Sequence, residues 1–343
     1  MCLSGPAALA LAALVAAVPR PSVAQDIRVR EHVEVQRVLL DVRAVDSRGN
    51  PILGLGPEDF LVSVDGRPAA LESVEWVSGT QPYAEGLTPE QAASVGAEPA
   101  QQGRLIVYFF QTDFAGVRLS GLMHMKARAI RLLGTLTPGD RVAVVSFDSH
   151  LKLRQDFTDD SKKLSRAIHD AILFGKEPNI APRPFPSLAR SFDQAAAKAA
   201  AEPETGLLVT ARALEALPGA KSLVYFGWGL GHLSRPWVVM GRDYGAARAA
   251  LARGRVTVFA IDVTDADFHD LEVGLEQVAA DTGGFYAKTN LFPGQAITRL
   301  EGAFAGHYVL VVVKPDLAHG EHAVAVELAR QRGIVLVKPS FQD

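Results

Sequence analysis

The sequence predicts an α/β protein with a doubly wound, mostly parallel sheet and an accessory β-sandwich-like domain built from both chain ends. The chain has 343 residues, of which 48% are apolar and 21% charged, as in ordinary globular proteins. From residue 104 to residue 305, short apolar runs alternate with helical patterns, which is typical of a parallel sheet. Residues 30–78 and 306–343 contain strand patterns only, and neither segment can bury a face alone. We therefore expect the two ends to meet in one β-domain.

The charge balance excludes a whole-molecule attraction to nucleic acid or to an anionic membrane. The chain carries 35 basic and 38 acidic side chains, a formal net charge of −3. We expect a protein partner that is bound by a local surface, and no nucleic acid. The only cysteine is Cys2, so thiol catalysis, cysteine-based zinc sites and disulfides are excluded from the folded part.

The N-terminus has the pattern of a secretory signal peptide, which we place at residues 1–24. Residues 7–18 form an apolar run that is too short to span a bilayer, and residues 22–24 are small, as a signal peptidase requires. A disordered alanine-rich leader is the alternative. No later segment approaches the ~20 apolar residues of a spanning helix, so we expect no membrane span and a periplasmic or secreted protein.

The two β-segments flank a linker and the α/β part. Alternating and branched residues predict strands from residue 33 to residue 76, with turns at 47–51 and at Asp65-Gly66. Residues 79–103 lose the hydrophobic pattern and fill with Gly, Pro, Glu, Gln and Ala, which indicates a linker. After residue 306, strands are expected at 308–313, 322–328 and 334–337.

The α/β part, residues 104–305, begins with a βαβ unit. Residues 105–110 and 142–147 are continuous apolar runs, as expected when helices cover both faces of a sheet, and a helical stripe lies between them. Thr158 is in the position of a helix N-cap, with two aspartates after it. The other expected elements are an edge strand at 150–157, strands at 222–226 and 256–261, and helices at 187–201, 205–217, 244–252 and 271–282. Right-handed crossovers make this sheet doubly wound.

The sequence lacks the common catalytic and cofactor-binding motifs. The chain has no Gly-x-Ser-x-Gly elbow, His-Glu-x-x-His helix or Walker loop. The stretch from Gly227 to Gly231 has the wrong glycine spacing for a dinucleotide site and is interpreted as a loop. His319 and His322 flank a turn without a third ligand for zinc. We therefore expect no enzyme activity and no cofactor.

Several segments of the α/β part resemble von Willebrand factor type A domains. More narrowly, the pattern of residues 45–55, Asp59-Phe60 and Asp65-Gly66 resembles the start of a secreted group known from Acidobacteria. The resemblance implies a six-stranded doubly wound sheet and a binding module. The segments similar to type A domains are residues 105–110, 136–147, 155–158, 217–226 and 281–286.

The resemblance also implies a metal-ion-dependent adhesion site, which this chain has in degenerate form. Such domains commonly hold a divalent ion with an Asp-x-Ser-x-Ser loop, a Thr and a later Asp. Here Gln111 stands in the place of the first Asp, Asp113 and Ala115 in the places of the two Ser, and Gly227-Trp228 in the place of the later Asp. A hard cation that loses these oxygen ligands should bind very weakly, so we expect no metal at this position.

Other residues keep alternatives open at the same sheet edge. Asp113, Asp148 and Asp262 each follow a predicted strand, so a displaced cation site is one alternative to capping or solvated carboxylates. Thr210 or Ser187 is the candidate for the second-loop hydroxyl. Asp265 and Asp267 follow closely behind Asp262.

The expected contact surface is this edge together with the proline-rich segment 177–186. Phe185, Arg183, Trp228 and Trp237 are of types enriched at binding hot spots, while packing of the two tryptophans under the loop 227–242 is the alternative. Three functions follow: a non-enzymatic binding or adhesion module, metal-dependent adhesion through relocated carboxylates, and a cryptic hydrolase. The predicted binding residues are Gln111, Asp113, Phe185, Thr210, Trp228 and Asp262.

Overall fold

The computed structural model describes residues 36–78, 103–112, 116–289 and 293–343. Gln36–Asp343 form one compact unit. The expected signal peptide, residues 79–102 of the expected linker, Asp113 and Ala115 lie outside the described residues. None of the described helices is long and apolar enough to cross a membrane.

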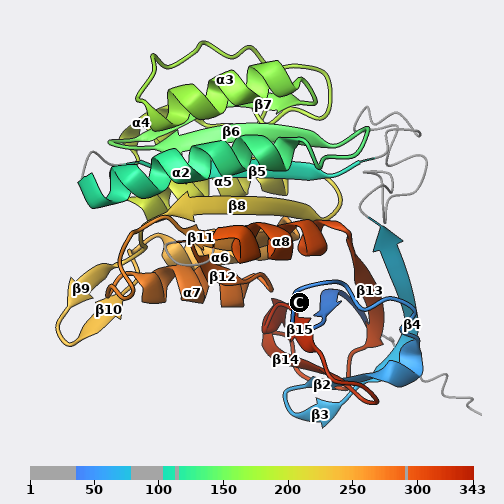
Figure 1. Cartoon of the computed structure of the whole chain (residues 1–343). Coiled ribbons are helices and arrows are strands. Elements are labelled where there is room, and N and C mark those ends of the chain that lie inside the picture. The colour runs from blue at the N-terminus through green and yellow to red at the C-terminus, as the bar shows by residue number, and fades with distance from the viewer. Residues whose placement is uncertain (1–35, 79–102, 113–115, 290–292) are drawn as a thin grey trace, which may run out of the picture. The chain divides into compact units, whose positions relative to one another are not determined.

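A six-stranded sheet forms the centre of the α/β part (Figure 1). Its spatial order is β12-β11-β8-β5-β6-β7, in which β7 is antiparallel and the other pairs are parallel. This order confirms the predicted fold class. The strands are β5 (Leu105–Gln111), β6 (Arg141–Phe147), β7 (Leu151–Thr158), β8 (Lys221–Gly227), β11 (Val256–Asp262) and β12 (Tyr286–Lys288).

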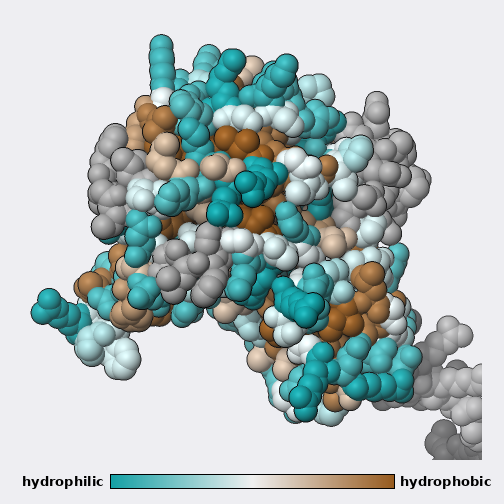
Figure 2. Space-filling view, in the orientation of Figure 1, coloured by the Kyte–Doolittle hydropathy of each residue, from teal (hydrophilic) through white to brown (hydrophobic). Residues whose placement is uncertain are grey.

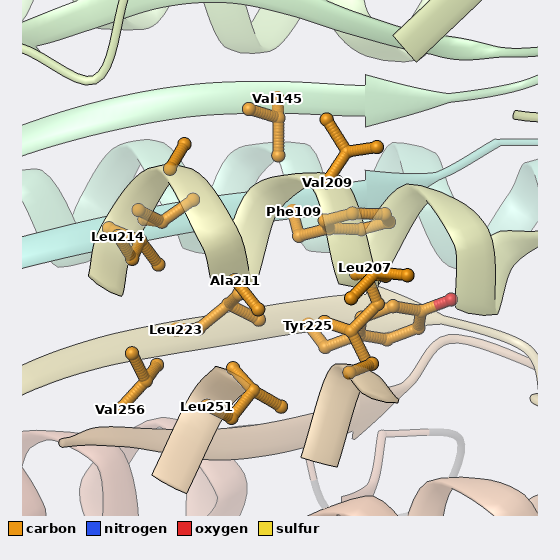
Figure 3. Packing of buried hydrophobic residues seen from close by; sticks show 14 of the residues in the cluster. Phe109, Val145, Leu207, Val209, Ala211, Leu214, Leu223, Tyr225, Leu251 and Val256 are labelled. Atoms are coloured by element: carbon orange, nitrogen blue, oxygen red, sulfur yellow. The ribbon is translucent and has the colours of Figure 1, made fainter. Parts of the chain in front are cut away.

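Helices cover both faces of this sheet, which explains the continuous apolar runs. Alternate residues of β5 point to opposite sides, so Phe109 joins one hydrophobic cluster and Phe110 the other. Figure 3 shows Leu207 and Leu214 of α5 packed over β-strand residues such as Phe109. One face carries α2 (Gly116–Leu133), α3 (Ser161–Ile172) and α8 (Pro293–Phe304). The other carries α4 (Gln194–Ala199), α5 (Pro203–Glu215), α6 (Tyr244–Arg253) and α7 (Glu272–Asp281).

The outer side of the helical layer is polar. Hydrophilic residues gather over α3 in the view of Figure 2. The same helix buries Leu164 and Ile168 against the sheet, so its two sides differ as expected for an amphipathic surface helix.

The accessory β-domain pairs strands from both chain ends. In one sheet, of order β15-β1-β13-β4, Leu40 lies opposite Leu310; in the other, of order β16-β14-β2-β3, Val62 lies opposite Val326. A hydrophobic cluster fills the space between them. Its elements are β1 (Arg37–Val45), the 3-10 helix η1 (Pro57–Asp59), β2 (Phe60–Val64), β3 (Arg67–Pro68), β4 (Ala70–Ser78), β13 (Gly306–Val313), β14 (Glu321–Leu328), β15 (Ile334–Leu336) and β16 (Ser340–Gln342).

Two predicted elements differ from the structure, and the predicted loop 227–242 contains a hairpin of two short strands, His232–Ser234 and Trp237–Val239. Thr158 is the last residue of β7, and Asp160 caps α3 instead, because its carboxylate accepts from the N–H groups of residues 162 and 163. The helix predicted at 187–201 is reduced to α4, which Asp193 caps. The sequence analysis missed α8, whose residues Ala296 and Leu300 are buried against the sheet.

Candidate functional site

A buried amide closes the carboxyl edge of the sheet at β5. Gln111, the last residue of β5, is 1% exposed. Its Oε1 accepts hydrogen bonds from the backbone N–H of Trp228 at 3.0 Å and of Gly229 at 3.3 Å. The Nε2 of Gln111 has no partner among the described residues. The neutral side chain thus joins β5 to the segment that follows β8.

Gly227, the last residue of β8, leaves no room for a side chain. A Cβ at this position would lie 2.6 Å from Gln111 Oε1 and 2.3 Å from the ring of Tyr225. Since the ring is part of the buried core, it cannot move aside easily. An aspartate at position 227 is therefore incompatible with the observed place of Gln111.

Trp228 forms one wall of a pocket at this edge. The guanidinium carbon of Arg118 lies 3.6 Å from the centre of the Trp228 ring, which is a cation–π contact. The pocket has a volume of about 330 Å³, and Thr264, His269 and Leu271 also line it. The indole Nε1 of Trp228 is buried and has no acceptor in the described part of the chain. The pocket is therefore lined by an aromatic ring and a cation.

A two-stranded hairpin, β9 (His232–Ser234) with β10 (Trp237–Val239), follows Trp228 (Figure 1). The buried carboxylate of Glu204 accepts from the N–H of Gly231, and from that of Gly241 at 3.4 Å, so it holds both ends of the hairpin segment. Trp237 is 73% exposed. It is therefore not packed in a satellite core, and its indole lies available on the surface.

Asp262 ends β11 at the same edge and is fully buried. Its Oδ1 accepts from the N–H and the hydroxyl of Thr264, at 2.9 and 2.8 Å. Its Oδ2 lies 2.8 Å from both His269 Nε2 and the Tyr286 hydroxyl. A carboxylate has about four acceptor positions, and these contacts use all four. Burial, followed by the Asp262 charge, raises the pKa of Tyr286, which therefore stays a neutral donor.

Asp262, His269 and Glu272 are the described residues that could hold a metal ion. One ligand atom from each lies within 4.8 Å of the others. Lys288 Nζ, however, lies 2.5 Å from Glu272 Oε2. A cation bound here would have to displace this ammonium group and at least one hydrogen bond of Asp262.

The other aspartates of this edge lie apart from Asp262. Asp148 binds Lys152 at 2.5 Å and accepts from Ser149. Three strand spacings separate the ends of β6 and β11, about 14 Å at ~4.8 Å each, which is too far for one shared ion. Asp265 and Asp267 are exposed in the loop before α7.

Three predicted site residues are therefore brought to one edge, and Thr210 is not. Gln111, Trp228 and Asp262 lie at the carboxyl ends of neighbouring strands. Thr210 lies about 10 Å along α5 from its first residue, and its hydroxyl donates to Gly206 O at 2.9 Å. Phe185 is half-buried against the hydrophobic core.

Ser187, the other candidate for the second-loop hydroxyl, is also turned away from the edge. Its hydroxyl donates to Asp156 Oδ2 at 2.6 Å, and Asp156 also accepts from the N–H of Leu188 at 2.7 Å. These bonds hold the end of the proline-rich segment against β7. They also involve Ser187 and Leu188, the first residues of the helix that was predicted at 187–201.

The sequence analysis missed four residues of this edge: Arg118, Glu204, His269 and Glu272. His269 and Glu272 follow a predicted strand within ten residues of Asp262, and that spacing is the signal that was available. Glu204 stands in the first turn of α5, where an acidic residue is common as a partner of the helix N-terminus. Arg118 has no such signal, because only the packing of α2 places it over Trp228.

The six-stranded sheet has five parallel strands, which form four parallel pairs, and one antiparallel edge strand, and helices cover both of its faces. The sequence resemblance implies a six-stranded doubly wound sheet of this kind. The fold is von Willebrand factor type A-like. No protein-family model matches the sequence. No curated protein matches it either.

Solved structures with a similar fold come from several bacteria. A von Willebrand factor type A protein from Catenulispora acidiphila has a TM-score of 0.43 at 9% identity, over 90% of this chain and 72% of that one. BatB from Bacteroides thetaiotaomicron has a TM-score of 0.40 at 15% identity, over 59% of this chain and 98% of that one. The vWF domain of the type V pili tip protein Mfa5 from Porphyromonas gingivalis has a TM-score of 0.38 at 12% identity, over 58% of this chain and 94% of that one.

Proposed function

We propose that this chain is a secreted or periplasmic binding module that holds a protein partner at the carboxyl edge of its six-stranded sheet, without a divalent ion above Gln111. The observation that carries the proposal is the amide bridge from Gln111 to the N–H groups of Trp228 and Gly229. It places a neutral side chain where the resemblance implies an anionic ligand. The pocket of Arg118 and Trp228 lies beside it.

The chemistry of this pocket favours recognition of a partner's side chain. Trp and Arg are the residues that most often dominate binding energy, because they combine a large contact area with specific polar groups. The exposed Trp237 of the adjacent hairpin extends the same surface. In domain terms, we propose that the binding part, 104–305, is inserted between residues 30–78 and 306–343 of the β-domain, with 79–103 as linker and 1–24 as signal peptide.

The arrangement around Asp262 supports binding rather than catalysis. The Thr264 hydroxyl donates to Asp262 and not to His269, so Thr264 and His269 do not form a nucleophile–histidine pair. A screen with ester, phosphoester and glycoside substrates should find no turnover. Turnover by the natural chain that is lost in His269→Ala would support the hydrolase alternative instead.

The proposal is tested by crosslinking in the native host followed by mass spectrometry, with and without EDTA. We expect the same partners under both conditions, and loss of most of the crosslinked partner in Trp228→Ala. Arg118→Ala should lose the same partner, and Arg166→Ala, on the exposed side of α3, is its matched control. Melting temperatures of all variants show whether each one is folded. Unchanged partners in a folded Trp228→Ala variant would contradict a contact at this edge.

Metal-dependent adhesion is the second candidate function, and the cluster of Asp262, His269 and Glu272 favours it. Titration calorimetry with Mg²⁺, Mn²⁺ and Ca²⁺ separates it from the first. Our proposal expects no saturable heat. Saturable binding that Glu272→Gln abolishes, while Glu276→Gln on the exposed side of the same helix preserves it, would establish the relocated site.

A further inference from the structure

A cluster of buried positive charge lies at the opposite, amino edge of the sheet. Arg43 of β1, Lys221 of β8, Arg255 and Lys338 surround a single carboxylate, that of Asp41. Arg255 binds both oxygens of Asp41, with Nη2 at 2.5 Å and Nε at 3.1 Å. We call these four cationic residues the basic cluster.

His307 is a fifth basic residue beside the carboxylate of Asp41. Its Nε2 lies 3.4 Å from Asp41 Oδ1. Burial would raise the pKa of Asp41, but the contacts with His307 and Arg255 outweigh it and hold that pKa well below its usual range. Asp41 is therefore ionised, and it supplies one negative charge to the basic cluster.

The members of the basic cluster that do not bind Asp41 bind backbone carbonyls near helix C-termini. Lys221 donates to Leu217 O, just beyond α5; Lys338 donates to Ala252 O in α6 at 3.2 Å. Arg43 donates to Ala303 O in α8 at 3.3 Å. Helix C-termini stabilise cations, but each carries only about half of an elementary charge. The basic cluster therefore keeps a surplus of positive charge.

Burial is the main cause of the lowered pKa of both lysines. Burial, followed by the charge of Arg255, lowers the pKa of Lys221 to about 7. Burial also lowers the pKa of Lys338 to about 8, against the favourable charge of Asp41. Buried charges without full compensation are costly, and a bound counter-ion would relieve that cost.

A cavity of about 190 Å³ opens beside Lys338 and Arg255. Two further arginines line it with carboxylate partners: Arg253 binds Glu215 at 2.6 Å, and Arg248 lies 3.1 Å from Glu321. The ammonium of Lys338 meets no carboxylate within 4 Å in the described part of the chain, and it donates to the carbonyl of Ala252. Of the remaining acidic groups of the lining, Asp281 accepts from the Tyr244 hydroxyl at 2.6 Å.

We infer that this cavity binds a small tetrahedral oxyanion, phosphate or sulfate, between Lys338 and Arg255. The volume equals that of roughly six waters at ~30 Å³ each, which leaves room for such an ion with part of its hydration shell. The ammonium group of Lys338 supplies a compact positive charge and hydrogen-bond donors, and Arg255, whose Nε and Nη2 are bound to Asp41, supplies a second positive charge. The bound ion would add the negative charge that the basic cluster lacks.

The test measures melting temperature and binding heat with inorganic phosphate and with sulfate, at an ionic strength held constant with sodium chloride. Phenyl phosphate forms a third arm, since its binding would point to the phosphate group of a larger ligand rather than the free ion. We expect a saturable rise in melting temperature with phosphate that chloride does not produce. No saturable effect of any of the three probes would overturn the inference.

The variant Lys338→Met tests the residue that carries the inference. It should bind phosphate at least about tenfold more weakly. In the absence of phosphate it should melt no lower than the natural chain, because it loses a buried, uncompensated charge. Lys198→Met, on an exposed position of α4, is the matched control and should bind like the natural chain. Undiminished binding in Lys338→Met would equally overturn the inference.

Discussion

Replacement of Gln111 by methionine should destabilise the protein although the new side chain keeps the length and shape of the old one. The substitution removes the one acceptor of two backbone N–H groups, those of Trp228 and Gly229. The amide nitrogen of Gln111 has no described partner, so its loss breaks no further bond.

The size of the effect follows from the burial of the two donors. The Gly229 N–H bond is buried, and a buried donor left without an acceptor costs about 1–3 kcal/mol. The Trp228 N–H bond is partly exposed, so water can replace part of it, and we assign it about 0.5–1.5 kcal/mol. Two gains offset part of this loss: the new side chain is apolar, and the buried amide nitrogen of Gln111, which has no described partner, is removed. The free energy of unfolding should therefore fall by roughly 1–2 kcal/mol.

Urea unfolding followed by circular dichroism measures this free energy, and hydrogen exchange locates its origin. The amides of Trp228 and Gly229 should exchange faster in Gln111→Met than in the natural chain. Gln277→Met, on the exposed side of α7, is the control and should change stability by less than about 0.5 kcal/mol. Equal stability of Gln111→Met and Gln277→Met, with both amides still protected, would refute the argument that the amide bridge closes this edge.

Two further predictions concern the basic cluster. Asp41→Asn should lower the free energy of unfolding by about 3–5 kcal/mol, because it leaves Arg43 and Arg255 without their buried carboxylate. Urea unfolding measures this change, and a loss below about 1 kcal/mol would contradict the prediction. The depressed pKa of Lys221, about 7, implies that stability rises with pH from about 7 to the lysine value of 10.5, because the unfolded chain holds a proton there that the folded chain has released. Lys221→Met should flatten that rise in unfolding experiments at a series of pH values, and an unchanged slope would count against a buried, neutral Lys221.

Most of the strands and helices could be predicted from local sequence patterns. The apolar runs at 105–110 and 142–147 specify strands that are covered on both faces, because no other element buries every residue of so short a run. The start of α3 was placed two residues early, since Thr158 and Asp160 are both good caps and only the pairing of Thr158 with Val142 in the sheet decides between them. The helix α8 was not predicted, although its buried residues Ala296, Ile297 and Leu300 recur at helical spacing.

The candidate site divides in the same way between sequence and tertiary structure. The sequence alone placed Gln111, Trp228 and Asp262 at strand ends, and parallel strands bring such ends to one edge, so their proximity could be predicted. Arg118 over Trp228, Lys288 at Glu272 and Lys338 beside Arg255 join elements that are distant along the chain. Side-chain periodicity states which face of an element is buried, but the partner across that face depends on the packing of whole elements. The neutral side chain at the end of β5 could therefore be predicted from the residues themselves, whereas the pocket and the buried positive charge depend on the tertiary structure.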